Sequence, residues 1–488
     1  MTEPGSGTLP ELPVGAMGLA IEPVPPMATM AAPPASDGQR IAQLMQLATE
    51  HDQAGRLDQA EEVLRRLLAE AGTHHPALHL LGIVAFKQAR TDEAARLMER
   101  SIALAPMEAL YQRNICEIYR VQGRFDEALV AGRRAAALAP ADVHCYHNLG
   151  VLHYHRLELD EAIACGERAL ALVPEFAGAH FGIAEASLLR GDLARGWDEY
   201  EWRSKLANAP PLLPSTDRAQ WDGTPLRDQR LLLIADQGYG DVIQFARYIP
   251  WAEARCPMLA IACSSELHPV IRQFSGVDTL FDHWQQAPEF AAYCPLSSLP
   301  RLAGTRLDTI PGEVPYLRAD PARTASWSER LAALLPQGYR RIGIVWAGRP
   351  THHNDRNRST ALATFLPLAE IPGIALVSLQ KGPAQMQIGR YWGRAPLVNL
   401  GPELRDFGDT MAVLECLDLV VAVDTSVVHL AGAMGKEAWV MLPHAPDWRW
   451  LLNRNDSPWY PSLRLFRQGA DRQWDPVVAA IAAALQAE

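Results

Sequence analysis

Apolar positions divide the chain into stretches with different periods. Between residues 41 and 207 they recur at helical spacing, and the helical segments repeat one another along the sequence. Between 230 and 470, short apolar runs alternate with helical stretches, which predicts parallel sheets built from βα units. The first 38 residues are rich in Pro, Gly, Ala and Met and have no helical period. We therefore expect a disordered tail over 1–40.

The first helical stretch carries a repeat of fixed length. Small residues recur 34 positions apart at the same place in successive segments: Ala60, Ala94, Ala128, Ala162 and Gly196. Prolines keep the same spacing: Pro106, Pro140 and Pro174. Small side chains let paired helices approach closely, glycine permits the turn between them, and proline ends the second helix. This period is the signature of tetratricopeptide repeats and predicts an α solenoid of five repeats over 41–207.

Two roles fit such a solenoid. Its concave face holds a polypeptide partner, or the repeats serve only for stacking or dimerisation. One repeat also contains four histidines: His144, His147, His153 and His155. We expect these histidines to lie on separate helix faces rather than in a metal site.

The sequence after the repeats predicts an α/β structure. Residues 208–229 are rich in proline and lack periodicity, which predicts a linker. The apolar runs that follow are 230–235, 258–263, 341–348, 374–380, 417–424 and 438–442. They predict two doubly wound lobes, over 230–320 and 321–488, joined by residues 311–321. In such sheets ligands bind at the carboxyl ends of the strands, here in the cleft between the lobes.

Composition restricts the classes of function. The chain has 488 residues and a formal net charge of −11, which disfavours general binding to nucleic acids or anionic membranes. The seven cysteines are scattered and form no CxxC pair, so neither a disulfide framework nor a zinc site is indicated. The start lacks the basic region of a signal peptide, and no uncharged apolar run approaches the ~20 residues of a membrane span. We expect a cytoplasmic protein.

The first apolar run of the α/β region leads into a turn with two glycines. Gly238 and Gly240 permit a tight turn, and Asp241 falls at the start of the next helix. The third glycine of a dinucleotide fingerprint is absent. The Asp241 carboxylate either acts as a general base beside the cleft or caps the helix.

Two polar segments follow strand ends in the second lobe. After 341–348 comes a basic loop with Arg349, His352, His353, Arg356 and Arg358. Arginines in a loop suit phosphate oxygens, and the alternative is an exposed, solubilising loop. Gln380 and Lys381 end the next run, on the same side of the sheet.

The run 417–424 leads into the most specific segment. Asp424 ends the strand, Thr425 and Ser426 begin a helix, and His429 lies one turn further on. Hydroxyl groups and free N–H groups at a helix N-terminus form an anion site that suits a diphosphate. The alternative is an ordinary helix cap followed by a core histidine.

An aromatic segment follows over 443–461. It contains Trp448, Arg449, Trp450, Arg454, Trp459 and Tyr460. These aromatic rings either stack on a base or sugar, with the arginines on phosphate, or pack against one another to hold the lobe together.

Four segments carry a family resemblance: WAGRPTHHNDRNRS, SLQKG, DTSVVHLAGAMGK and DWRWLLNRNDSPWYPSLRLFRQ. They resemble bacterial tetratricopeptide-repeat proteins whose carboxyl-terminal glycosyltransferase domain is similar to the ADP-heptose:lipopolysaccharide heptosyltransferases. The layout is also similar to that of O-GlcNAc transferase, without a match of motifs. The resemblance implies a GT-B fold, with a Rossmann-like acceptor lobe and a Rossmann-like nucleotide-sugar lobe. It also implies inverting transfer with no metal or other cofactor.

The resemblance assigns roles to the polar residues of the second lobe. Asp424, Thr425 and Ser426 match the family's segment at the donor phosphates, and His429 matches its following histidine. Ser426 departs from the family because heptosyltransferases usually carry glycine there, and this departure bears on the donor sugar and nucleotide.

The same resemblance covers the first lobe. Gly240 and Asp241 match the family's GD pair, whose Asp is the proposed base, within DQGYGD where relatives more often read EQGLGD. In the implied reaction Asp241 takes a proton from the acceptor hydroxyl as it attacks the anomeric carbon. The charge on the departing diphosphate then falls to the helix at 425–426 and to Arg349, Arg356 or Lys381.

Three functions remain open at this point. The first is sugar transfer from a nucleotide-sugar to a hydroxyl of a protein acceptor, such as flagellin or another surface protein, held by the repeats. The second is a heptosyltransferase-like role in lipopolysaccharide or other glycan assembly, which the lack of a basic amphipathic segment disfavours. The third is a non-catalytic scaffold with a degenerate transferase domain, which the retained Asp241, basic loop and 424–426 disfavour.

Overall fold

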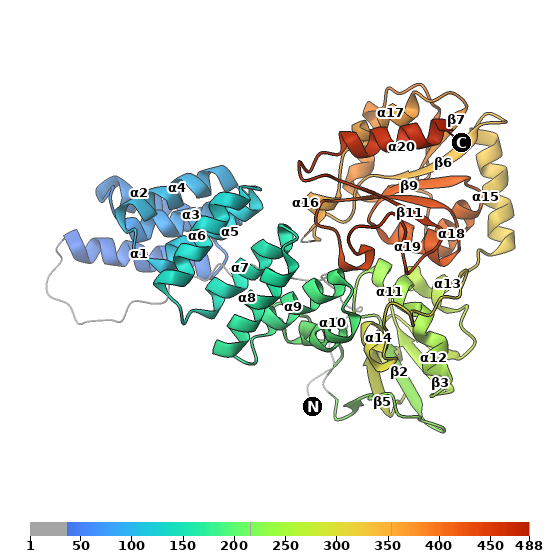
Figure 1. Ribbon diagram of the computed structural model, residues 1–488, viewed down its shortest axis with the longest axis horizontal. Coiled ribbons are helices and arrows are strands. Elements are labelled where there is room, and N and C mark those ends of the chain that lie inside the picture. The colour runs from blue at the N-terminus through green and yellow to red at the C-terminus, as the bar shows by residue number, and fades with distance from the viewer. Residues whose placement is uncertain (1–36, 215, 353, 488) are drawn as a thin grey trace. The chain divides into compact units, whose positions relative to one another are not determined.

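The computed structural model describes residues 37–214, 216–352 and 354–487. Most of the predicted tail lies outside this part of the chain, and residues 37–40 begin the first helix. The described chain forms two compact units that divide between Ala186 and Ser187. Figure 1 shows a helical unit and an α/β unit with two sheets.

Ten helices make up the repeat region. They are α1 (Asp37–Gln53), α2 (Leu57–Glu70), α3 (His75–Lys87), α4 (Thr91–Leu104), α5 (Ala109–Val121), α6 (Phe125–Leu138), α7 (Val143–His155), α8 (Leu159–Leu172), α9 (Ala177–Arg190) and α10 (Leu193–Tyr200). The second helices of the pairs begin 34 residues apart, which confirms the predicted period. The division between the units falls within α9, so α10 belongs with the α/β unit.

Small residues lie where the repeat helices touch, as their period predicts. Ala60, Ala94 and Ala128 are fully buried. A Cβ atom placed on Gly132 of α6 would lie 2.7 Å from Cδ2 of Leu149 on α7. A larger side chain at these positions would push the helices apart, because real Cβ contacts are longer than this.

The turns inside the repeats all use the left-handed backbone region. The residues at this phase are Gly55, Ala89, Gly123, Leu157 and Gly191, each with positive φ. Glycine adopts this conformation without strain, whereas a residue with a Cβ is strained by roughly 1–2 kcal/mol. Two of the five turns therefore carry conformational strain.

Replacing Ala89 with Gly should stabilise the repeat unit. Ala89 is exposed and has φ 62°, so the substitution removes strain and no buried contact. After the greater flexibility of glycine in the unfolded chain is subtracted, we expect a gain of about 0.5–1 kcal/mol in the free energy of unfolding. Urea unfolding followed by circular dichroism measures it.

The equivalent turn supplies a matched control for this prediction. Gly55 has φ 71°, and a Cβ there would meet no atom within 4 Å. Gly55→Ala should therefore destabilise by about 1 kcal/mol through backbone strain alone. All thirteen tryptophans lie at or after Trp197, so tryptophan fluorescence reports separately on the α/β unit. A loss of stability in Ala89→Gly would contradict the inference that the backbone at Ala89 is strained.

The first sheet of the α/β unit is parallel throughout, in the order β1-β5-β2-β3-β4. Its strands are β1 (Ala219–Gln220), β2 (Arg230–Ile234), β3 (Met258–Ala262), β4 (Val277–Phe281) and β5 (Ala292–Pro295). The chain runs outward from β2 through β3 to β4 and then returns to the other side of β2 as β5. The direction of winding thus reverses beside β2, where a doubly wound sheet binds its ligands.

The second sheet is also parallel, in the order β11-β10-β9-β6-β7-β8. Its strands are β6 (Arg340–Val345), β7 (Ile374–Ser378), β8 (Leu397–Asn399), β9 (Leu419–Val423), β10 (Ala438–Leu442) and β11 (Leu463–Arg467). Here the winding reverses between β6 and β9. The basic loop follows β6, and Asp424 follows β9.

Further helices connect the strands of the two lobes or follow the last strand. They are α11 (Tyr239–Phe245), α12 (Ile249–Glu253), α13 (His268–Ile271), α14 (Leu299–Leu302), α15 (Pro321–Leu334), α16 (Asp355–Arg358), α17 (Leu366–Ala369), α18 (Phe407–Glu415), α19 (Ser426–Ala433) and α20 (Asp475–Ala487). The segment read as a linker contributes the short strand β1 to the first sheet. Its Trp221 is buried, with its ring 5.6 Å from that of Trp251.

Candidate functional site

Two helices from different lobes bring their first turns together. Helix α11 follows β2, and α19 follows β9, so both begin at the carboxyl ends of strands beside the reversal points. A Cβ atom on Gly240 would lie 2.7 Å from Cδ2 of His429 and 3.5 Å from Cα of Ser426. The GD turn of the first lobe thus lies against the start of α19, and only glycine permits this approach. We call this region the interlobe site.

Asp241 forms a buried ion pair across the lobes. Its carboxylate accepts a hydrogen bond from Nη2 of Arg449, whose Nη1 donates to Asp447 at 2.8 Å and whose Nε donates to the side chain of Gln244. Burial raises the pKa of Asp241, and the Arg449 guanidinium acts in the opposite direction. The N-cap of α11 is Gly238, which removes the interpretation of Asp241 as the helix cap.

The sequence predicts Arg449 only as a contact for phosphate. Its side chain is instead buried and paired with Asp241 and Asp447. Asp241 and Arg449 lie 208 residues apart, so no local sequence pattern predicts that they pair.

Asp424 and His429 are buried next to each other. Nε2 of His429 lies 3.7 Å from Oδ1 of Asp424, and its Nδ1 lies 3.1 Å from the hydroxyl of Tyr460. Burial lowers the pKa of His429 well below 6.5, with nearby arginines adding to the effect, so the ring is neutral at pH 7. Burial also raises the pKa of Asp424 to about 6, with Asp447 adding to the effect and Arg358 opposing it.

The raised pKa makes Asp424 a source of pH-dependent instability. Its contribution to stability is complete below pH 3.8 and is lost as the pH rises through about 6, because the folded state disfavours the charge. We expect Asp424→Asn to be more stable than the parent at pH 7.5 by about 2–3 kcal/mol, and equally stable near pH 4. Urea unfolding followed by tryptophan fluorescence measures the difference. A difference in stability between Asp424→Asn and the parent that does not change with pH would contradict the raised pKa of Asp424.

Thr425 and Ser426 start α19 without capping it. Thr425 is the N-cap residue, yet its side chain makes no capping hydrogen bond. Within the described part of the chain its Oγ1 has no hydrogen-bond partner. This hydroxyl is buried, and N of Val428 donates to O of Thr425 at 3.1 Å, so the N–H groups of Ser426 and Val427 are those that the helix start leaves for an anion.

The basic loop presents its arginines in different ways. Arg358 is half-buried, donates to Asp355 at 3.4 Å and acts electrostatically on Asp424 and His429. Arg349 and Arg356 are exposed. His353 lies outside the described residues. The loop is held by Ser359, whose hydroxyl accepts from N of Gly348 and donates to Asp355, both at 2.8 Å.

Gln380 and Lys381 are adjacent in sequence but differ in burial and in hydrogen-bond partners. The Gln380 side chain is buried and hydrogen-bonds four backbone groups, including N of Trp346 at 3.0 Å and O of Ala347 at 2.9 Å. It joins the ends of β6 and β7, so its polar atoms are already used. Lys381 is exposed, donates to O of Leu404 at 2.6 Å and acts electrostatically on Glu266 of the first lobe.

The aromatic segment packs within the protein. Its rings are almost completely buried: Trp448, Trp450, Trp459 and Tyr460. Trp448 lies edge-on to Trp197 of α10 at 5.1 Å, and Trp450 stacks on His429 at 5.4 Å. Arg454 pairs with Asp456. Burial contradicts the interpretation that these rings stack on a base or sugar.

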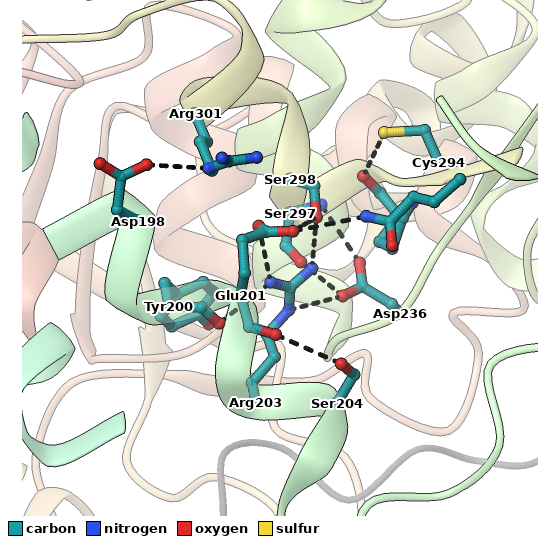
Figure 2. A network of polar contacts seen from close by, with 12 residues as sticks. Asp198, Tyr200, Glu201, Arg203, Ser204, Asp236, Cys294, Ser297, Ser298 and Arg301 are labelled. Atoms are coloured by element: carbon teal, nitrogen blue, oxygen red, sulfur yellow. Dashed lines mark hydrogen bonds and ion pairs between the residues drawn. The ribbon is translucent and has the colours of Figure 1, made fainter. Parts of the chain in front are cut away.

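A second buried ion pair lies at the carboxyl ends of β2 and β5 in the first lobe (Figure 2). Nε of Arg203 donates to Asp236 at 3.0 Å, and its Nη2 donates to Ser298 at 2.7 Å. Asp236 also accepts from N of Ser297 at 3.1 Å. This network ties the chain after α10 to the ends of β2 and β5. Asp236 is thus a structural carboxylate a few residues before Asp241.

The prediction that the four histidines of α7 lie on separate faces is wrong for one pair, because His144 and His147 share a neighbour. Phe176 contacts the rings of His144 and His147, whereas His153 pairs with Glu158 and His155 with Arg120. No group of three or more His, Cys, Asp or Glu placed to hold a metal occurs within the described ranges. Among the helices described, none is long and apolar enough to cross a membrane.

Comparison with known proteins identifies the repeats. Residues 79–143 and 143–173 match family models described as tetratricopeptide repeat. The solved structure of MamA MSR-1 C2 is 24% identical, covering 34% of this chain and 96% of its own, with a TM-score of 0.30. TTC0263, a thermophilic TPR protein in Thermus thermophilus, is 22% identical, covering 34% and 91%, with a TM-score of 0.31.

A longer likeness reaches beyond the repeats. Protein FlbA of Caulobacter vibrioides is 28% identical over 346 residues, which are 64% of this chain and 55% of FlbA. The chain thus spans about half the length of this relative. A match over 64% of 488 residues exceeds 1–207 and therefore includes part of the α/β unit. The chain carries tetratricopeptide repeats in its amino-terminal region, followed by an α/β unit with two parallel sheets.

Proposed function

We propose that the protein is a glycosyltransferase of the GT-B type that transfers a sugar from a nucleotide-sugar to a polypeptide hydroxyl. One observation carries the proposal. The first turn of α11, which carries Asp241, lies against the first turn of α19 from the other lobe, beside the reversal points of both sheets. A carboxylate facing an anion site is the arrangement that inverting sugar transfer needs, because proton removal and leaving-group stabilisation occur on opposite sides of one carbon.

The residues present divide the reaction between them. Asp241 takes the proton of the acceptor hydroxyl as that oxygen attacks the anomeric carbon. The bond from this carbon to the diphosphate breaks, and its electrons remain on the phosphate oxygen. The N–H groups of α19, the hydroxyls of Thr425 and Ser426, and Arg358 stabilise this new charge. Arg349, Arg356 and Lys381 are exposed cations that can add to it.

The acceptor side of the proposal rests on the repeats. A tetratricopeptide solenoid presents an extended concave surface, which suits a polypeptide better than a small molecule. The family models support a repeat region, and the likeness to FlbA extends into the α/β unit. We therefore assign the repeats to acceptor binding.

Nucleotide binding tests the donor site. We expect one of UDP, ADP, GDP or CMP to raise the melting temperature, because a ligand at about 100 times its Kd stabilises the folded state by ~2.7 kcal/mol. The shift should persist with EDTA. Ser426→Glu places a carboxylate where the diphosphate would lie and should abolish the shift. Ser328→Glu, at an exposed position of α15, adds the same charge and should leave it unchanged.

Two results would count against the enzyme. No shift with any of the four nucleotides at millimolar concentration would favour the non-catalytic scaffold. A shift that is equal in Ser426→Glu and in the parent would place the nucleotide elsewhere.

A further inference from the structure

A pocket lies where the two lobes are joined and shares no residue with the interlobe site. Its volume is about 380 Å³. Three arginines line it, and we call it the arginine pocket: Arg272 follows α13 of the first lobe, Arg318 lies on the connection between the lobes, and Arg323 belongs to α15. Cations from the end of α13 and from the connection that leads into α15 thus line one cavity.

Two of these cations, both exposed, have no ion-pair partner among the described residues. Arg323 is paired with Asp406 and Asp409, so its charge is already balanced. The side chains of Arg272 and Arg318 form no hydrogen bond or ion pair with any of the described residues. Asp320, the one carboxylate of the lining, accepts from N of Arg323 at 2.8 Å as the cap of α15. The pocket therefore keeps a local positive charge in a chain whose net charge is −11.

The surroundings of the pocket hold its two sides together. Oε1 of Gln273 accepts from N of Arg318 at 2.8 Å, which ties the connection to the end of α13. Nε2 of Gln273 lies 3.6 Å from Sδ of the buried Met411 on α18. The backbone carrying both free guanidinium groups is thus positioned before any ligand binds.

We propose that the arginine pocket binds the phosphate group of a small phosphorylated metabolite. Arginine donates paired hydrogen bonds to phosphate oxygens, and a tetrahedral phosphate can accept from Arg272 and Arg318 together. The cavity is larger than a bare phosphate and lies within the range of small-molecule sites, which leaves room for an organic part. Because both lobes line the pocket, the ligand stabilises their junction. This proposal is independent of sugar transfer.

Calorimetric titration of the full chain at constant ionic strength tests whether the arginine pocket binds a phosphate group. The probes are inorganic phosphate and glycerol 3-phosphate, with glycerol as the neutral counterpart. We expect saturable binding of the phosphate ester with a Kd of about 1 mM or tighter, and a weaker Kd for inorganic phosphate. Arg272→Ala/Arg318→Ala should weaken binding at least about tenfold. Arg227→Ala/Arg390→Ala removes two exposed charges elsewhere and should change nothing.

The Ser426→Glu variant separates this pocket from the interlobe site. Phosphate binding that survives in Ser426→Glu and is lost in Arg272→Ala/Arg318→Ala supports the arginine pocket. Binding lost in Ser426→Glu but retained in the double variant would overturn the proposal in favour of the interlobe site. Absence of saturation in the parent chain would overturn it as well. Tighter binding of inorganic phosphate than of its ester would overturn the assignment to a metabolite.

Discussion

Asp241→Asn should lower the rate of sugar transfer by at least about a hundredfold and leave nucleotide binding unchanged. General base catalysis typically contributes 10²–10⁴-fold, and an amide cannot take the proton. The side chain keeps its size, and Arg449 retains its hydrogen bonds to Asp447 and Gln244, so the interlobe contact should persist. The measurement is release of the nucleoside diphosphate from the matching nucleotide-sugar with acceptor polypeptide present.

The control for Asp241→Asn removes the same charge elsewhere. Asp228→Asn is exposed before β2 and should retain the parental rate. The nucleotide-induced rise in melting temperature should be the same in both variants, which separates loss of chemistry from loss of the donor site. Near-parental transfer by Asp241→Asn would show that another group is the base.

Arg203→Ala should destabilise the α/β unit by about 3–5 kcal/mol, because it leaves the buried carboxylate of Asp236 without its ion-pair partner. The Arg203 side chain is 6% exposed and that of Asp236 is 2% exposed, so water cannot replace the guanidinium. The lost hydrogen bond to Ser298 adds to the effect. Urea unfolding followed by tryptophan fluorescence measures it, since every tryptophan lies in this unit.

A neighbouring ion pair in Figure 2 provides the matched control. Arg301 pairs with Asp198 at 2.9 Å, but the two side chains are 44% and 71% exposed. Arg301→Ala should therefore destabilise by less than about 1 kcal/mol. Equal effects of the two substitutions would contradict the assignment of a buried, uncompensated charge. In Arg203→Met/Asp236→Asn most of the stability should return, because neither charge remains.

The repeats were the easiest part to predict. Each repeat packs only against its neighbours, so one local rule recurs every 34 residues and becomes visible as a period. Both the helix starts and the family models agree with it. The period did not indicate that Ala89 and Leu157 adopt the backbone conformation otherwise held by glycine.

The strands were predicted where they are buried on both faces. The runs that became β2, β3, β6, β7, β9 and β10 are continuous and apolar, as central parallel strands require. The missed strands β1, β4 and β8 are short or partly exposed, so hydrophobicity did not mark them. β5 and β11 were also missed: β5 is a short strand that ends in proline, and β11 carries charged residues.

By itself the sequence determined the repeat period, the alternation of strands and helices, and the polar residues that follow strand ends. Such features depend on neighbours within a few residues or on a fixed spacing. Only the tertiary structure decided that Asp241 pairs with Arg449 rather than capping α11, and that the aromatic segment is buried. It also decided that Arg272 and Arg318 face one cavity. Each of these outcomes depends on which distant segments exclude water from one another, and burial, not residue type, then sets partner and charge.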